Sequence, residues 1–418
     1  MLVFKFGGAS VKDAEGIINL GHVVNLYADE QLLIVVSAMG KTTYALEKLT
    51  KAYVTQSDDL HDIYEGIKQY HYNILTQLFE ASDPVFNDVA NTFVEIDWML
   101  EDEPHDDYDF IYDQIVSVGE LVSTRIVNAY LNKTGLSSRW LDVRGYIHTD
   151  NTYREGVVQW QKTKESILKD IPAMLEKSIV VTQGFLGGTS ENFTTTLGRE
   201  GSDYTASIFA SCLGAESVTT WKDVPGILNA DPKLFSDTVK FDELTYAEAI
   251  EMTYYGASVI HPKTIKPLQN AKIPLLVKPF TDPGAPGTVI KEDGQNRFEK
   301  PVIIIKQNQV LLSISAKDYS FISEDHLSEL FRLFAKNHVK VNMMQTSALS
   351  FTVCVNYDEG RFKRLLKDLG ENFKARYNSD LTLITSRHYT PASLKELTEG
   401  KTILLEQISR NTAQMVVR

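Results

Sequence analysis

The stretch LVFKFGG, residues 2–8, is an apolar run around one lysine that ends in two glycines. A run of this length, bounded by glycines, is typical of a buried strand that ends in a turn. The pattern recurs in QLLIVVS, residues 31–37, and in SIVVTQGFLGG, residues 178–188. Helical spacings separate these strands, so the sequence predicts an α/β domain whose central sheet is mostly parallel.

Further elements follow from the spacing of apolar residues between glycine-rich turns. We expect helices over about 13–27, within 42–100, over 115–131 and over 202–213, and strands at 138–142 and 217–221. Residues 101–113 are strongly acidic, and we interpret them as a solvent-exposed connection. The turn-rich TDPGAPGT and the polar KEDGQNRFEK that follows it, between about 280 and 300, are interpreted as a linker.

The C-terminal region has a different rhythm. We expect strands at 303–306, 310–315, 339–344, 350–356 and 381–386, and helices at 325–337 and 359–369. This β-α-β-β-α-β order indicates a ferredoxin-like α+β unit. A shorter set, from 381 through 403–407 to 414–417, resembles a second unit without its closing helix and strand. The expected domains are therefore 1–295, 296–380 with the linker, and a truncated unit 381–418 that strand 302–307 would complete.

Composition limits the classes of function. A chain of 418 residues is long enough for two or three domains, and its net charge of −13 opposes binding to nucleic acid. No apolar run is long enough to span a bilayer. The two cysteines, Cys212 and Cys354, are far apart and lack neighbouring histidines, which argues against a disulfide framework or a zinc site. A reducing, cytoplasmic compartment is expected.

Two glycine loops follow the first two predicted strands. In KFGGAS, residues 5–10, glycine N–H groups and Lys5 could contact a phosphate, although a simple tight turn fits equally well. SAMGKTT, residues 37–43, imitates a Walker A loop but has Val35 where that motif needs glycine. By itself this second stretch is better explained as an ordinary strand-to-helix turn, although ligands do bind at the carboxyl ends of parallel strands.

Three later stretches carry charged residues next to predicted buried elements. Glu120, in the apolar IVSVGELVSTRIV, needs a partner or a ligand, and a pair with Arg125 or Lys133 is the simpler explanation. TTTLGREGSD, residues 194–203, joins a polar glycine-rich loop to a helix N-terminus, which together with its arginine favours an anion site. WKDVPGI, residues 221–227, could contact a nucleotide, although Pro-Gly is also a strong turn signal.

Together these stretches resemble the aspartate kinases of the amino-acid kinase superfamily. The resemblance rests on KFGGAS, SAMGKTT, SVGE, TTLGREGSD, KDVPGI followed by ADP, and GASVIHPKT, which occur in that family's order and approximate spacing. It covers the whole chain and implies a three-layer amino-acid-kinase sandwich followed by tandem ACT-type regulatory domains. It also implies ATP-dependent phosphorylation of the aspartate side chain with Mg²⁺, the first step of lysine, threonine and methionine synthesis, by a homodimer that pairs through its ACT domains.

The resemblance implies roles for individual residues. The implied catalytic set is Lys5, Gly7, Gly8 and Asp203. The implied aspartate pocket is Thr43, Glu120, Phe185, Arg199 and Ser202, with Arg199 on the α-carboxylate and Glu120 on the α-ammonium. The implied ATP site is Lys5, Ser10, Trp221, Lys222, Asp223, Leu228, Lys233 and Ser258. The ligands of the metal ion are not assigned.

Several positions depart from the family pattern. The departures in the kinase domain are Ala9 for threonine, Glu200 for glycine, Lys222 for threonine, Ser258 for lysine and Leu228 for an aromatic residue. In the first ACT-type unit, Asn342 and Ala348 replace an acidic pair that holds lysine in lysine-inhibited relatives, so lysine inhibition by that route is expected to be weak or absent. Two alternatives remain: a sister kinase for another small carboxylate, and an amino-acid sensor without catalytic activity.

Overall fold

The computed structural model describes residues 1–257, 260–318 and 320–418, which form two compact units. The first unit contains residues 1–227, 240–250 and 260–296, and the second contains 228–239, 251–257 and 297–418 with the exception of 319. Two segments that were expected within the domain 1–295, namely 228–239 and 251–257, therefore belong to the second unit. Each unit is described by itself.

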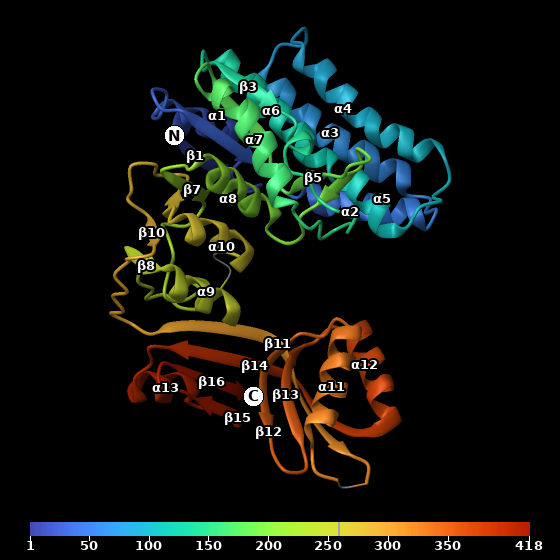
Figure 1. Ribbon diagram of the computed structural model, residues 1–418, viewed down its shortest axis with the longest axis vertical. Coiled ribbons are helices and arrows are strands. Elements are labelled where there is room, and N and C mark those ends of the chain that lie inside the picture. The colour runs from blue at the N-terminus through green and yellow to red at the C-terminus, as the bar shows by residue number, and fades with distance from the viewer. Residues whose placement is uncertain (258–259, 319) are drawn as a thin grey trace. The chain divides into compact units, whose positions relative to one another are not determined.

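The first unit is of the α/β type (Figure 1), and one of its helices, α9, ends within the segment 251–257 that belongs to the second unit. Its strands are β1 (Leu2–Phe6), β2 (Leu32–Val36), β3 (Ser138–Leu141), β4 (Ile179–Gln183), β5 (Leu186–Gly188), β6 (Thr194–Thr196), β7 (Ser217–Lys222), β8 (Glu243–Thr245), β9 (Leu275–Pro279) and β10 (Thr288–Lys291). Its helices are α1 (Ala14–Asn25), α2 (Thr42–Val54), α3 (Leu60–Leu78), α4 (Val85–Glu101), α5 (Tyr108–Val116), α6 (Val118–Lys133), α7 (Trp160–Leu175), α8 (Gly201–Leu213), α9 (Tyr246–Tyr255) and α10 (Pro262–Ala271). A 3₁₀ turn, η1, covers Val143–Gly145.

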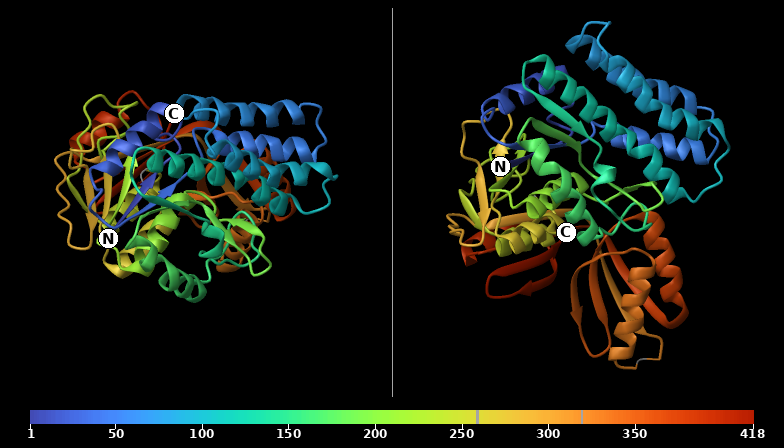
Figure 2. Two further views of the ribbon diagram at one scale, coloured as in Figure 1. Left: turned by 90° about the horizontal axis from the view of Figure 1, so that it is seen from above. Right: turned by 45° about the horizontal axis from the view of Figure 1, so that its top comes forward.

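An eight-stranded sheet forms the middle layer, in the order β3-β4-β2-β1-β7-β9-β10-β8. All neighbouring strands are parallel except β9 and β10, which are antiparallel. Helices α1 and α6 cover one face and α7, α8 and α10 lie on the other (Figures 1 and 2). The expected three-layer sandwich with a mostly parallel sheet is therefore confirmed.

Strand alternation assigns the side chains of β1 to the two faces. Phe4 and Phe6 point into the core beneath α1 and α6, where they pack against the ring of Trp221. Lys5 lies between them in sequence and therefore points to the opposite face, toward α8. Strands β2 and β7 flank β1 on either side, so the carboxyl end of β1 is a switch point of the sheet, where open α/β sheets bind ligands.

The second unit is built on one antiparallel sheet in the order β12-β13-β11-β14-β16-β15. Its strands are β11 (Val302–Ala316), β12 (Val341–Thr346), β13 (Phe351–Asn356), β14 (Phe373–Arg387), β15 (Ile403–Ile408) and β16 (Thr412–Val417), and its helices are α11 (Glu324–Lys336), α12 (Glu359–Asn372) and α13 (Pro391–Thr398). The elements β11, α11, β12, β13, α12 and β14 follow the ferredoxin-like order.

Two long strands join the halves of this sheet. Residues 303–306 and 310–315 were predicted as separate strands, but both lie in β11, which pairs with β14 along its length with a register shift near Gln309. The first half, with α11 and α12, has its own core around Val310 and Leu330. The second half has only α13, whose Leu397 packs on Ile384.

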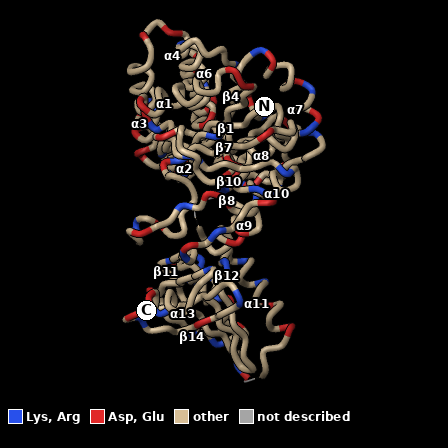
Figure 3. Tube along the Cα trace, turned by 90° about the vertical axis from the view of Figure 1, so that its left-hand side faces the viewer, with Lys and Arg blue, Asp and Glu red and all other residues tan. Residues whose placement is uncertain are grey.

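One predicted connection is different in the structure. The acidic stretch 101–113 was interpreted as solvent-exposed, but α5 begins at Tyr108 and Asp113 is fully buried. In the described ranges, no helix combines the length and apolar character needed to cross a membrane. Acidic and basic positions are interspersed along the chain trace of each unit (Figure 3).

Candidate active site

A buried ion pair lies on the α8 side of the sheet. The Nζ atom of Lys5 is 2.8 Å from Oδ1 of Asp203, and the two side chains are only 10% and 5% exposed. Asp203 is in the first turn of α8, where a helix N-terminus favours an anion. Burial alone would raise the pKa of Asp203, but the positive charges of Lys5 and Lys222 hold it below its ordinary value. The carboxylate is therefore ionised at neutral pH.

The glycine turn after β1 is in backbone contact with the loop after β2. Gly40 donates its N–H to the carbonyl of Gly8 at 3.0 Å, and a Cβ on Gly8 would lie 2.6 Å from the carbonyl oxygen of Ala38. A Cβ on Gly7 would lie 3.5 Å from Nζ of Lys5. The surface of the turn is thus next to the ammonium group, which is the arrangement that a phosphate requires.

Glu120 contributes a buried carboxyl group to the same edge. It lies in the first turn of α6 and is 3% exposed. Its Oε1 accepts the N–H of Ala38 at 3.4 Å, while Oε2 is buried and has no hydrogen-bond partner among the residues that the structure describes. Burial raises the pKa of Glu120 to about 8. A cationic group of a ligand would satisfy the free oxygen. The simpler explanation, a pair with Arg125 or Lys133, does not account for it.

The loop after β4 and the start of α8 are tightly packed together. Gly184 donates to the carbonyl of Val36 at 3.0 Å, and a Cβ on Gly184 would be 2.4 Å from the Cβ of Ser202. Phe185 has a φ of 71° and donates its N–H to Oγ1 of Thr205 at 3.0 Å. Phe185 and Ser202 are therefore brought together beside the ends of β2 and β4.

Arg199 and Glu200 immediately precede α8. Arg199 is exposed and lies four residues before Asp203, so the same loop carries an exposed guanidinium and leads into the buried ion pair. Glu200 adopts a left-handed φ of 54°. Glycine accepts this conformation without steric cost, so the glycine that the resemblance implies at this position would be unstrained there.

Asp113 supports the threonine-rich loop and was missed in the sequence. Its carboxylate accepts hydrogen bonds from the N–H and Oγ1 of Thr196, at 2.9 and 2.7 Å, and from the N–H of Arg154 at 2.8 Å. Burial raises its pKa to about 6, against the opposing effect of these donors. A signal was present, because this acid lies in FIYDQIV, residues 110–116, where five of the other six residues are apolar or aromatic.

The other predicted site residues occupy varied positions. Thr43 is half-buried in the first turn of α2, and the buried Ser10 donates to the carbonyl of Trp221 at 3.4 Å. The indole of Trp221 is in the core, which leaves its backbone as the group available to a nucleotide. The remaining predicted nucleotide residues are Lys222 at the end of β7, the exposed Asp223, Leu228 and Lys233 in the second unit, and Ser258, which lies outside the described residues.

Comparison with known proteins establishes the family. The profile of the amino acid kinase family matches residues 1–279, and the chain belongs to this family. Within it, lysine-sensitive aspartokinase 3 of Escherichia coli (strain K12) is 30% identical over 356 residues, covering 85% of this chain and 78% of the relative. Chloroplastic aspartokinase 3 of Arabidopsis thaliana is 32% identical over 378 residues, and the chain spans 64% of that longer relative.

The fold is also similar to solved structures of an aspartokinase. E. coli aspartokinase III in complex with aspartate and ADP, described as the R-state, aligns with all of this chain and 96% of its own, with a TM-score of 0.85 and 26% identity. The T-state structure of the same protein, in complex with lysine and aspartate, aligns with a TM-score of 0.82 and 27% identity.

Proposed function

We propose that this protein transfers the γ-phosphoryl group of ATP to the side-chain carboxylate of L-aspartate and forms 4-phospho-L-aspartate. The observation that carries the proposal is the buried Lys5–Asp203 pair, beside a glycine turn whose neighbour Ala38 also contacts Glu120. This edge of the sheet offers a cation and backbone N–H groups for phosphate, and an unsatisfied carboxyl oxygen for an ammonium group. ATP carries the phosphate groups, and aspartate carries the ammonium group.

Each charged residue then has a separate task. Glu120 binds the α-ammonium of aspartate, and Arg199 binds its α-carboxylate as a planar fork. Lys5 neutralises charge between the side-chain carboxylate and the γ-phosphate, and Asp203 holds the lysine in place. An aspartate side chain has a pKa of ~3.9 and is already a nucleophile at neutral pH, so no general base is needed. Catalysis is therefore positioning and charge neutralisation.

Mg²⁺ fits this donor set as a partner of ATP. This ion usually keeps several waters and is held by substrate phosphates with one or two carboxylates, and when bound it would neutralise part of the negative charge on the phosphates. Over the ranges that the structure describes, no group of three or more His, Cys, Asp or Glu side chains is arranged to hold a metal ion by itself. Asp203, buried beside Lys5 at this edge of the sheet, is the acid of this chain that would contact the ion or its waters.

The second unit is proposed to be regulatory and to form the homodimer. Its sheet has two open edges, β12 and β15, and β15 exposes the apolar Ile403, Leu404 and Ile408. An exposed apolar edge strand tends to pair with another chain. The mass in solution should therefore be that of a dimer, and a charge at Ile408 should shift it toward the monomer. The cytoplasmic location and the place in lysine, threonine and methionine synthesis remain expectations.

The test is ADP release with ATP and Mg²⁺ and one acceptor at a time. The panel contains aspartate, glutamate, N-acetylglutamate and UMP, with a reaction lacking acceptor as the control. We expect turnover with aspartate alone, and hydroxylamine should trap its acyl phosphate product. Turnover with another acceptor but not aspartate would indicate a sister kinase, and nucleotide binding without turnover would indicate a sensor.

A further inference from the structure

Helix α3 carries two neighbouring aromatic residues that contact the turns at the predicted phosphate edge of the sheet. The hydroxyl of Tyr70 donates to the carbonyl of Lys12, at the end of the turn that follows β1. The imidazole of His71 is fully buried, and its Nε2 lies 3.4 Å from Oγ1 of Thr42, at the start of α2. None of the stretches that carry the family resemblance includes α3, so the resemblance implies no role for either aromatic residue.

The hydroxyl of Tyr70 lies against both turns at once. Gly40 has a φ of 56°, and a Cβ added to it would be 2.6 Å from the hydroxyl oxygen of Tyr70. The same Cβ would be 3.5 Å from Cβ of Lys12. Gly40 in turn donates its N–H to the carbonyl of Gly8 at 3.0 Å. One phenol group therefore fixes the turn after β1 against the turn after β2, beside the glycine backbone that is predicted to contact phosphate.

The buried histidine supports the loop after β2 from the same helix. Nδ1 of His71 donates to the carbonyl of Ile67 at 2.8 Å, which fixes the orientation of the ring. Thr42 donates its hydroxyl to the carbonyl of Met39 at 2.6 Å and lies against the other ring nitrogen. Burial lowers the pKa of His71 to about 4, so the ring is neutral at neutral pH and adds no charge beside this edge. Helix α3 thus braces the loop after β2 at Thr42 as well as at Gly40.

We propose that Tyr70 is a positioning residue for phosphoryl transfer, which holds the glycine turn after β1 where the γ-phosphate needs it; this inference rests on the proposed kinase function. Backbone N–H groups stabilise a transferring phosphoryl group best when they are fixed in place before the reaction. A misplacement of about 1 Å at such a site can lower a rate about 100-fold. Tyr70 fulfils this role without contacting either substrate, through the carbonyl of Lys12 and the backbone of Gly40.

The first test is Tyr70→Phe, which keeps the ring and removes only the hydroxyl. The Lys12 carbonyl then loses its donor, and the turn after β1 loses a contact with α3. We expect kcat to fall about tenfold and the KM for ATP to rise. The KM for aspartate should stay the same, because no group assigned to aspartate is altered. Steady-state kinetics of the full chain with ATP, Mg²⁺ and aspartate measure all three quantities.

Two other tyrosines of α3 provide matched controls. The hydroxyl of Tyr64 lies 2.7 Å from Oδ1 of Asp97 and 3.0 Å from the carbonyl oxygen of Phe93, so it joins α3 to α4. Tyr64→Phe should lower the urea midpoint and leave kcat unchanged, which separates loss of stability from loss of positioning. The ring of Tyr72 stacks on that of Phe86, and Tyr72→Phe should change neither the midpoint nor kcat.

A double-mutant cycle tests whether Tyr70 acts through Gly40. Gly40→Ala adds a methyl group that meets the Tyr70 hydroxyl, at a φ that alanine rarely adopts. In Gly40→Ala/Tyr70→Phe the hydroxyl is gone, and the nearest ring atom, Cζ, is 3.5 Å from the added Cβ, which is an ordinary contact. The loss of kcat in the double variant should therefore be smaller than the product of the two single losses. Losses that multiply would overturn the contact at Gly40 as the route.

The outcomes separate this inference from the kinase assignment. An unchanged kcat in Tyr70→Phe, or an equal fall in Tyr64→Phe, would overturn the positioning role in a protein that still phosphorylates aspartate. If the wild type turns over no acceptor in the panel, the proposed function fails, and calorimetric affinities of the same proteins for ATP decide the role of Tyr70. Weaker binding of ATP in Tyr70→Phe alone would support that role, and equal binding in all of them would overturn it.

Discussion

At the scale of single residues, variants of the buried pair Lys5 and Asp203 can distinguish its effect on folding stability from its effect on catalysis. Lys5→Met leaves a buried carboxylate without its cation, so we expect a loss of about 3–5 kcal/mol in unfolding free energy. We also expect kcat to fall roughly 100- to 1,000-fold, as when a charge-stabilising group is removed. The double variant Lys5→Met/Asp203→Asn should recover much of the stability but none of the activity. Recovered activity in the double variant, measured beside urea unfolding curves, would refute the role of Lys5.

We expect the buried carboxyl group of Glu120 to make the folding stability depend on pH. Its pKa is raised to about 8 by burial, so the stability contributed by the neutral carboxyl is fully present below the ordinary pKa and lost as the pH rises through about 8. Glu120→Gln should therefore differ little from the wild type near pH ~5. It should be the more stable protein above pH ~8.

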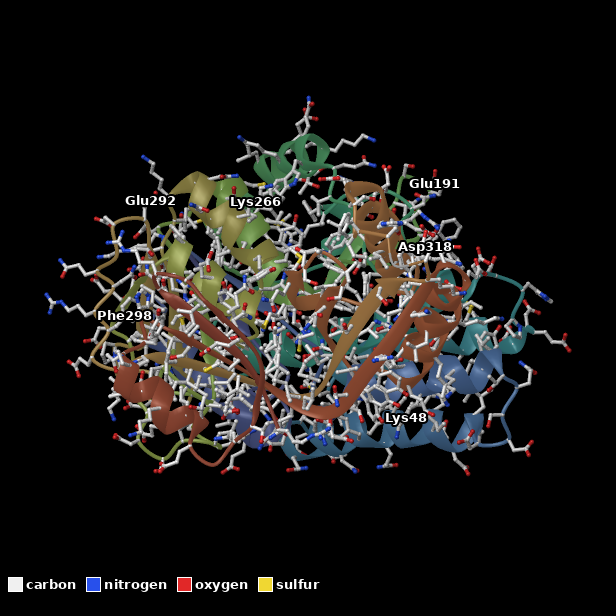
Figure 4. The ribbon with its side chains drawn as sticks, turned by 90° about the horizontal axis from the view of Figure 1, so that it is seen from below. Lys48, Glu191, Lys266, Glu292, Phe298 and Asp318 are labelled. Carbon is white, nitrogen blue, oxygen red and sulfur yellow. The ribbon has the colours of Figure 1, made fainter. Side chains whose placement is uncertain are left out.

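The same variant should bind aspartate poorly, because an amide cannot pair with the α-ammonium. We expect kcat/KM for aspartate to fall roughly 10- to 100-fold, chiefly through KM. Glu191→Gln is the control and should change neither property, because Glu191 (labelled in Figure 4) is exposed between β5 and β6. Unchanged kinetics in Glu120→Gln would remove this residue from the substrate site.

At the scale of elements, Asp113 makes α5 the support of the threonine-rich loop. Asp113→Ala would leave the buried N–H and hydroxyl of Thr196 without an acceptor, at a cost of about 2–4 kcal/mol in unfolding free energy. The KM for aspartate should rise as well, because this loop leads to Arg199. Asp109→Ala, on the same helix, removes an exposed pair with Arg154 and should cost less than about 1 kcal/mol. Equal losses in the two variants would contradict the assignment.

The elements also show what the sequence could predict. The strand, glycine turn and helix pattern was readable because β1, β2 and β4 are short apolar runs bounded by glycine. One break was misinterpreted: 303–306 and 310–315 were predicted as separate strands, but Asn308, with a φ of 53°, lies at an irregularity within the single strand β11, and Asp380, with a φ of 57°, lies at the matching place in β14. Asn and Asp tolerate this conformation in turns and bulges alike, so only the pairing of β11 with β14 distinguishes the two.

Part of the candidate site was also predictable, but from charged residues and not from the pattern of apolar runs. Lys5, Glu120 and Arg199 were singled out because charge next to a buried element is conspicuous in a sequence. Asp113 was missed because it ends an acidic run that otherwise suggests solvent. Its burial depends on contacts with Thr196, more than 80 residues away, and local pattern does not report contacts at that distance.

At the scale of the whole molecule, the proposed regulatory role depends on what the second unit can bind. Asn342 is one of the two positions at which the resemblance implies an acid in lysine-inhibited relatives, and its side chain is already engaged inside the sheet. Its Nδ2 donates to Gln309 and Asn356, at 2.9 and 2.8 Å, and its Oδ1 accepts Nζ of Lys306 at 3.0 Å. The position is therefore a structural junction of β11, β12 and β13, and it carries no charge for an effector's ammonium group.

Lysine is accordingly expected to leave the ADP-release rate unchanged at millimolar concentration. Asn342→Asp should not create sensitivity to lysine, because an aspartate there would place acceptor oxygens against those of Gln309 and Asn356. We expect it to lower the unfolding free energy by about 1–3 kcal/mol, in part offset by the nearby ammonium of Lys306. The measurements are the ADP-release rates of the wild type and of Asn342→Asp with and without lysine, together with urea unfolding curves of both. Strong inhibition of the wild type would mean that lysine is held by another set of carboxylates, and the junction at Asn342 would then have no bearing on feedback.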